Sequence, residues 1–360
     1  MYVENGKISN RQTLRLFVFD LMGIATLLIP PYLAKLCGVD GVFAVLLGTL
    51  AGFVYLFYLG WVMKQMQMDL KSYLNHMARP IVRSIALVFV MLHCLLTAGF
   101  CGYVFAKLMQ YSLVQESSFP LVLFVIVLVA GYAVSGGIES RARVYEVLFW
   151  FVLIPYTAMM LASVKNFELE YVTNIFATDK ESFTKGIYLV FLFFTPLFFS
   201  LFLIGEKEKN YGRNVIKTIS VSILIASGIL LGSYVLLLGN FGEYALGTMQ
   251  YPVVTLMSTI QFKGNFLKRM DSLMLAVWFF TLYALLNLHL HYAAGMIKEI
   301  FCKRKMKMLH VFAAMLLVYG AGYAMYLNSD WVGIFVNYYS YIAVPVLLAG
   351  PGLLLLCKKK

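Results

Sequence analysis

The chain has 360 residues, of which 61% are hydrophobic and only 13% are charged. A soluble domain carries about 25% charged residues, and a single water-soluble core stops growing at about 250–300 residues, so this composition excludes an ordinary soluble protein. The net charge of +12 is spread over short loops between apolar runs. This distribution favours the lipid bilayer, with its anionic headgroups, over nucleic acid as the partner of the basic residues.

Apolar runs long enough to cross a membrane recur along the chain. A helix needs about 20 apolar residues to span the hydrocarbon core. The sequence predicts ten transmembrane helices, at residues 13–36, 41–63, 84–107, 119–138, 144–164, 184–205, 215–238, 271–297, 308–327 and 332–357. The interval 239–270 is semi-polar, and its segment from Tyr251 to Phe266 is predicted to be amphipathic and to lie near the membrane surface.

The positions of Lys and Arg support this count and predict the orientation. Cytoplasmic loops of membrane proteins are enriched in Lys and Arg, and here the basic residues concentrate at both ends and in alternate loops. Both termini are therefore predicted to be cytoplasmic, as is the loop that carries Arg141 and Arg143. The N-terminus is polar up to Arg15, so no cleavable signal peptide is expected before the first span.

Two of the predicted spans contain residues that interrupt helices. The first holds Gly23, Pro30 and Pro31, and the sixth holds Thr195 and Pro196 near its middle. Proline cannot donate a backbone hydrogen bond, and a glycine such as Gly23 favours either close packing or an unwound turn. Interruptions at corresponding places in two halves indicate a transporter-type binding site, because a broken helix frees backbone groups for a ligand. The alternative, that Gly and Pro are simply common in membrane helices, stays open.

The same pattern predicts one transmembrane domain made of two five-helix units, at about 13–164 and about 184–357. An odd number of spans in each unit gives the two units opposite orientations. The chain contains no enzyme motif and no Cys or His spacing typical of a metal site. The five cysteines are expected to be small apolar packing residues or free thiols. We therefore predict no catalytic activity, no cofactor and no metal.

Polar side chains inside the predicted spans are candidates for function, because such groups are expensive in a bilayer. Asp20 lies one turn before Gly23, or alternatively lies near the cytoplasmic interface and pairs with Arg15. His93 and Thr97 share one face of the third span because they are four residues apart. On the eighth span, one face carries the polar residues Tyr283, Asn287 and His291. His289 points in another direction. For the histidines, an interhelical hydrogen bond without any ligand is the alternative.

These features predict a small-ligand pocket at mid-membrane, walled by the first, third, sixth and eighth spans. The ends of half-helices would bind a zwitterionic ligand without placing full charges in lipid. The predicted ligand-binding residues are Gly23, Thr26, His93, Thr97, Thr195, Pro196, Tyr283 and Asn287.

Four segments of the chain follow one another in an order that is typical of one protein family. They are residues 7–12 (KISNRQ) before Gly23 and Pro30, residues 137–146 (GIESRARVYE) before Pro155, the pair Tyr251-Pro252, and residues 266–272 (FLKRMDS) before Trp278. This order resembles the spore germination permease family, the B subunits of nutrient germinant receptors. The resemblance extends over nearly the whole chain.

The resemblance implies membership of the amino acid–polyamine–organocation superfamily and a LeuT-like fold. That fold is an all-α bundle of ten transmembrane helices in a five-plus-five inverted repeat, with broken first and sixth helices. The resemblance also implies that the protein binds a small germinant, often an amino acid, and triggers ion release. Its partners would be an A-subunit membrane protein and a C-subunit lipoprotein in the inner spore membrane.

The sixth span departs from the pattern of this family. Members often carry a Gly-aromatic-Glu stretch there with a later Pro, and this chain has Pro196, Leu197, Phe198 and Gly205 at those positions. The acidic residue is therefore absent. A stand-alone secondary transporter of amino acids or cations is an alternative function, as is a structural subunit with a vestigial pocket.

Overall fold

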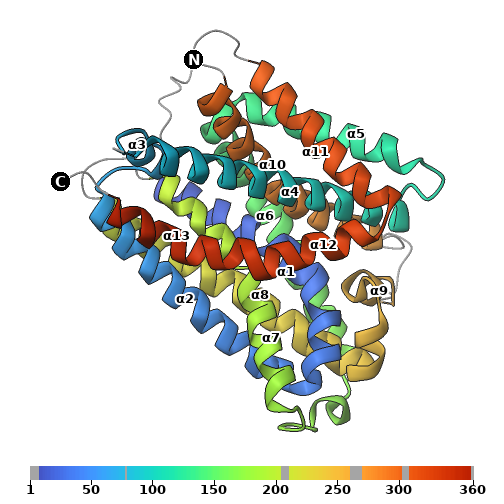
Figure 1. Cartoon of the computed structure of the whole chain (residues 1–360). Coiled ribbons are helices and arrows are strands. Elements are labelled where there is room, and N and C mark those ends of the chain that lie inside the picture. Colours follow the sequence, from blue (N-terminus) through green and yellow to red (C-terminus); the bar gives the residue numbers. More distant parts are fainter. Residues whose placement is uncertain (1–7, 78, 204–210, 260–269, 302–307, 358–360) are drawn as a thin grey trace.

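The computed structural model describes residues 8–77, 79–203, 211–259, 270–301 and 308–357, and all of their regular structure is helical (Figure 1). The long helices are α1 (Asn10–Cys37), α2 (Gly41–Met66), α4 (Pro80–Ser112), α5 (Phe119–Ser135), α6 (Gly137–Ser163), α7 (Lys180–Leu192), α8 (Tyr211–Thr248), α10 (Met270–Phe301) and α11 (Leu309–Leu327). The last stretch combines α12 (Asp330–Tyr338), the π-helical η7 (Tyr339–Ala343) and α13 (Val344–Leu356). Shorter elements are η1 (Gly38–Asp40), α3 (Leu70–Asn75), η2 (Val164–Asn166), η3 (Leu169–Val172), η4 (Thr195–Phe202) and α9 (Pro252–Thr259).

Among the described residues, eight helical stretches are long and apolar enough to cross a membrane. The first of them, Asn10–Met66, contains both α1 and α2, and α5 is a shorter apolar helix. Large apolar side chains also cover the outer surface, as Tyr132 at 80% exposed and Val147 at 78% illustrate, which is the arrangement expected for lipid contact. The chain is therefore a multi-pass membrane protein. The ten predicted spans coincide largely with these stretches and α5, except that the last two residues of the sixth, 204 and 205, lie outside the described residues. The number of crossings stays a prediction.

Helix α1 lies inside the bundle and packs against α6, α7, α8 and α10. It begins with a capping box, in which the Ser9 hydroxyl accepts from the Gln12 N–H and the Gln12 side chain accepts from the Ser9 N–H. It then continues without interruption to Cys37, with Pro30 and Pro31 inside it, in place of the predicted break at Gly23. The reason is close packing. A Cβ on Gly23 would lie 2.7 Å from the backbone carbonyl carbon of Thr281 in α10.

The predicted interruption of the sixth span is confirmed. Helix α7 ends at Leu192 and the chain continues as the 3₁₀-helix η4. Pro196 stands at the start of η4, where its missing N–H is tolerated. The Thr195 hydroxyl donates to the carbonyl of Leu192, at 2.9 Å, so it satisfies one of the carbonyls freed at the end of α7.

A carboxylate joins two distant segments at one end of the bundle. Asp40, between α1 and α2, accepts hydrogen bonds from the backbone N–H groups of Phe176 (2.5 Å) and Thr178 (2.9 Å). This fixes the connection before α7 against the turn between α1 and α2. Near this connection α8 kinks at Gly242, whose φ is +71°.

Helix α9 lies within the predicted amphipathic segment, whose position near the membrane surface stays a prediction. Most of its residues are buried, including Val253 and Leu256, and it packs against α8 and α10. It lies to one side of the bundle beyond the end of α8 (Figure 1). The remainder of the predicted segment, residues 260–266, lies outside the described residues.

Candidate ligand-binding site

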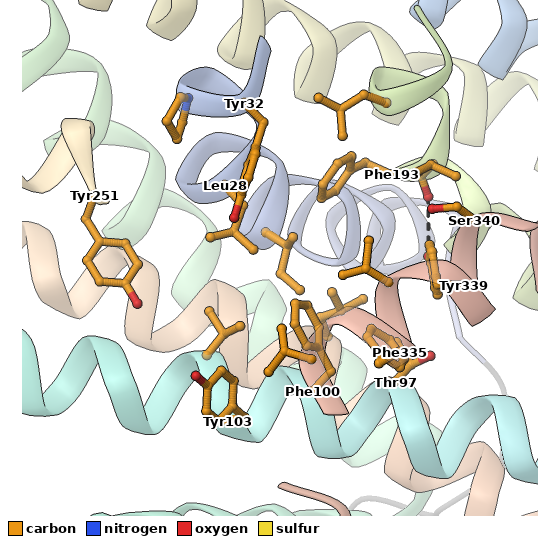
Figure 2. Close-up of a pocket in the computed structure, with 18 of the residues that line it drawn as sticks. Leu28, Tyr32, Thr97, Phe100, Tyr103, Phe193, Tyr251, Phe335, Tyr339 and Ser340 are labelled. Atoms are coloured by element: carbon orange, nitrogen blue, oxygen red, sulfur yellow. Dashed lines mark hydrogen bonds between the residues drawn. The ribbon is translucent and has the colours of Figure 1, made fainter. Parts of the chain in front are cut away.

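A cavity of about 550 Å³ lies between α1, α4, the α7–η4 break, α10 and α12. Part of its wall is also formed by the connection from α8 to α9, residues 247–251. Tyr251 and Tyr103 lie toward one end of the cavity, and Thr97 and Tyr339 lie toward the other (Figure 2). This volume is within the range of small-molecule sites. The walls that the sequence predicts are therefore present, with α12 as a further wall.

One face of α1 forms a side of the cavity along much of its length. The lining residues Asp20, Ile24, Leu28, Pro31 and Lys35 recur at helical spacing. At 1.5 Å per residue, Asp20 and Lys35 lie about 22 Å apart along the helix axis. Lys35 is exposed whereas Asp20 is buried. The cavity is therefore an elongated sleeve, with its mouth near Lys35 and its floor near Asp20.

The floor brings together polar side chains from three helices. The Thr97 hydroxyl of α4 is buried and has no hydrogen-bond partner among the described residues. His289 of α10 places its Nδ1 2.9 Å from the carbonyl of Leu285. Because a carbonyl can only accept, Nδ1 carries the proton of a neutral ring and Nε2 is its acceptor. A buried hydroxyl without a partner is costly, and a polar ligand would satisfy it.

Asp20 forms a buried ion pair with Arg141 of α6. Both side chains are less than 5% exposed. The Arg141 guanidinium also donates to the carbonyl of Ala284 in α10, at 3.1 Å, and lies over the ring of Tyr145. This pair links α1, α6 and α10 directly beside the cavity.

This pairing corrects two predictions. Arg141 does not lie in a loop, because α6 begins at Gly137, whose φ of +73° makes the sharp turn from α5. Asp20 does not pair with Arg15, whose guanidinium instead donates to the backbone carbonyl of Glu146 at 2.8 Å. A charge-bearing residue in an apolar span needs a counter-charge, and this requirement is the sequence signal that could have identified Arg141.

The cavity contains two of the eight predicted ligand-binding residues, Thr97 and Pro196. Gly23 and Thr26 lie on another face of α1, where the Thr26 hydroxyl donates to the Met22 carbonyl and accepts from the indole of Trp278. These two residues pack α1 against α10. Ligand binding by Thr97 or Pro196 stays a prediction.

The other four predicted residues serve contacts between helices. Tyr283 and Asn287 of α10 donate to backbone carbonyls of α5, at 3.1 and 3.2 Å, because their side chains project to the side of α10 that faces α5. Thr195 shares a hydrogen bond with the hydroxyl of Tyr339. The ring of His93 lies behind the wall, 5.8 Å from the ring of Tyr339 and 5.9 Å from that of His289.

Several lining residues were missed by the sequence prediction. Phe100 and Val104 continue the helical face of Thr97 on α4, so the spacing i+3 and i+7 could have identified them. Phe335 and Tyr339 come from the last helical stretch, where no comparable spacing signal occurs. Tyr339 begins the π-helical η7, and π-helical turns often occur at functional sites.

A membrane-spanning helical bundle with a cavity beside an interrupted helix is the architecture of permeases and transporters. The family model of spore germination proteins, the spore permease family, matches residues 7–326 of this chain. The chain therefore belongs to the spore germination permease family, and the resemblance noted in its sequence is confirmed.

Individual relatives agree with this assignment. The chain is 23% identical to spore germination protein B2 of Bacillus subtilis (strain 168), over 76% of this chain and 74% of that protein. It is 21% identical to spore germination protein YndE of the same organism, over 100% of this chain and 98% of that protein. Both are similar over most of their length.

A solved structure confirms the fold class. The structure of a Na⁺-coupled sialic acid symporter in a substrate-bound outward-open state superposes with a TM-score of 0.70, covering 96% of this chain and 79% of that chain. The two sequences are 12% identical, so the likeness concerns the fold alone. That symporter has the LeuT fold, and the all-helical LeuT-like architecture is therefore confirmed.

Proposed function

We propose that this chain is the membrane subunit of a spore nutrient germinant receptor. It binds a small germinant, an amino acid, in the sleeve along α1 and thereby triggers germination-associated ion release. The observation that carries the proposal is the cavity floor, where the buried Thr97 hydroxyl has no partner among the described residues. The names of its relatives, spore germination proteins B2 and YndE, support the germination role.

The proposal includes partners and a location. An A-subunit membrane protein and a C-subunit lipoprotein would complete the receptor in the inner spore membrane, with both termini of this chain in the cytoplasm. On that orientation the exposed Lys35 at the mouth faces outward, so the germinant enters from outside.

Cavity occupancy is tested by filling the sleeve. Leu28 lies midway along it, and Leu28→Trp is expected to abolish the nutrient response of spores while the protein still accumulates. Leu128→Trp is the matched control, because Leu128 lies on α5 and is 46% exposed. The loss of optical density of a spore suspension measures germination. A normal nutrient response of the Leu28→Trp spores would refute a germinant site in this cavity.

The orientation is tested by cysteine labelling in vegetative cells that produce the chain. A cysteine at Lys165 is expected to react with an impermeant maleimide in intact cells. A cysteine at Arg143, which is exposed at the start of α6, is expected to react only after permeabilisation. The opposite pattern would refute cytoplasmic termini.

The alternative of a stand-alone transporter makes a different prediction. Vesicles that contain this chain alone would then accumulate a labelled amino acid against its gradient, with no other subunit present. The receptor proposal expects no such accumulation.

A further inference from the structure

The charged, amide and imidazole side chains of the cavity wall lie at its two ends, and the remaining polar groups that line it are hydroxyls, those of Tyr32, Thr97, Tyr103, Thr248, Tyr251, Tyr339 and Ser340. Lys35 and Gln250 lie at the mouth, while Asp20, Thr97 and His289 lie at the floor. Between the ends the wall is largely apolar, with Leu28 and Phe100 among its residues, and the aromatic ring of Phe335 lies beside Thr97 at the floor (Figure 2). A ligand that fills the sleeve must therefore have a polar head and a sizeable apolar body.

The floor has no net charge. Of the lining residues, Asp20 and Lys35 are formally charged, and the Arg141 guanidinium already balances Asp20. Lys35 is about 22 Å away at the mouth. A ligand with a net charge would bring an unbalanced charge into a buried site, which is strongly unfavourable.

The hydrogen-bonding groups of the floor suit a zwitterion. The Asp20 carboxylate and the acceptor nitrogen of His289 accept hydrogen bonds, as an ammonium group requires. The Thr97 hydroxyl, which has no hydrogen-bond partner among the described residues, can donate to a carboxylate. Within one small molecule the two charges of the ligand balance each other.

We infer that the germinant is a net-neutral amino acid with a large apolar side chain, branched aliphatic or aromatic, and that the Asp20–Arg141 pair excludes ligands that carry a net charge. This inference rests on the proposed function and specifies the ligand of the same site. It assigns Arg141 as a positioning residue, which acts on the ligand through Asp20.

The first test is a nutrient panel on spores in which this receptor is the sole nutrient receptor. Leucine and phenylalanine are expected to trigger germination at lower concentrations than alanine. Leucine has three more carbons than alanine, so its half-maximal concentration should be about fiftyfold lower. Lysine, glutamate and glucose are expected to give no response.

The panel distinguishes a wrong ligand class from a wrong receptor proposal. A response to glucose, or to lysine better than to leucine, would overturn the ligand class while leaving the receptor proposal intact. A best response to alanine would do the same. Spores that respond to no nutrient would refute the receptor proposal itself and the inference with it.

The second test varies the charge balance. Leucinol has the side chain of leucine and a single positive charge, so the unmodified receptor should respond to leucine at least tenfold better. Arg141→Gln leaves Asp20 unbalanced and should shift this preference toward leucinol. The double variant Asp20→Asn/Arg141→Gln is neutral again and should restore the preference for leucine, at a higher half-maximal concentration.

Two features keep this test decisive. Arg143→Gln is the control, because Arg143 is exposed near Arg141 on the same helix and its loss should leave the preference unchanged. If Arg141→Gln fails to accumulate, the double variant alone carries the test. A double variant that accumulates normally and prefers leucinol would refute the role of the ion pair.

Discussion

Helix α1 has two faces with different surroundings. One face, from Asp20 through Leu28 to Lys35, lines the cavity. Another, with Gly23 and Thr26, contacts α10 so closely that no side chain fits at Gly23. Both faces carry polar or small residues at similar positions along α1. The residues that surround each side chain therefore decide whether it faces the cavity or packs against another helix.

Whether a polar side chain already has a hydrogen-bond partner indicates its role better than its depth in the membrane does. The Thr26 hydroxyl is fully used, because it donates to Met22 and accepts from Trp278. The Thr97 hydroxyl, opposite α1 across the cavity, has no partner among the described residues. Substitutions on the packing face should therefore change stability, and those around the cavity should change the ligand response.

The largest effect is expected for Gly23→Leu. The new side chain would collide with the backbone of Thr281, and overpacking of this kind destabilises by about 1–3 kcal/mol or more. The protein level in the membrane should fall sharply, as measured by quantitative immunoblot. Gly320→Leu is the control, since a Cβ there meets no described atom within 4 Å. Normal accumulation with a lost nutrient response would instead place Gly23 at the ligand.

Thr26→Val should have the next largest effect, again on stability. It removes the acceptor of the Trp278 indole in a buried site, which costs about 1–2 kcal/mol. The fraction of purified protein that survives a heat challenge should decrease, while the half-maximal nutrient concentration stays the same. A shift in that concentration at unchanged heat resistance would break the distinction between the two faces.

Thr97→Val should produce the converse result. Loss of one hydrogen bond to the ligand is worth about 0.5–1.5 kcal/mol, or roughly 2- to 12-fold in half-maximal concentration. Heat resistance without ligand should not decrease, because the hydroxyl has no partner to lose among the described residues. Thr157→Val on the exposed side of α6 is the control. An unchanged nutrient response would remove Thr97 from the site.

The smallest effect is expected for Thr195→Val. Thr195 contacts the hydroxyl of Tyr339, which lines the cavity and has a second hydrogen bond, to Leu192 at 3.3 Å. The remaining bond should hold Tyr339 nearly in place, so the half-maximal concentration should rise by about threefold or less. Thr184→Val, on the exposed start of α7, is the control. A tenfold rise would indicate that Thr195 contacts the ligand directly.

The sequence predicts the fold well because hydrophobic length and proline position are local signals. The helix break before Pro196 and the orientation of Thr97 toward the cavity follow from such signals alone. The continuity of α1 through Gly23 could not be predicted, because a glycine serves equally for unwinding and for close approach. The pairing of Asp20 with Arg141, and the entry of Phe335 and Tyr339 into the wall, depend on contacts between distant segments that no local pattern encodes.

The Asp20–Arg141 pair also has a consequence for the biosynthesis of the chain. The two residues are 121 positions apart, so α1 enters the membrane long before its counter-ion has been translated. An Asp near the centre of an isolated helix raises the free energy of membrane insertion by about 3 kcal/mol. For α1 this cost persists until α6 has been synthesised and supplies Arg141. Helix α1 should therefore reach its full stability only after the fifth helical span has been synthesised, which makes residues up to about Ser163 the smallest portion able to assemble during translation.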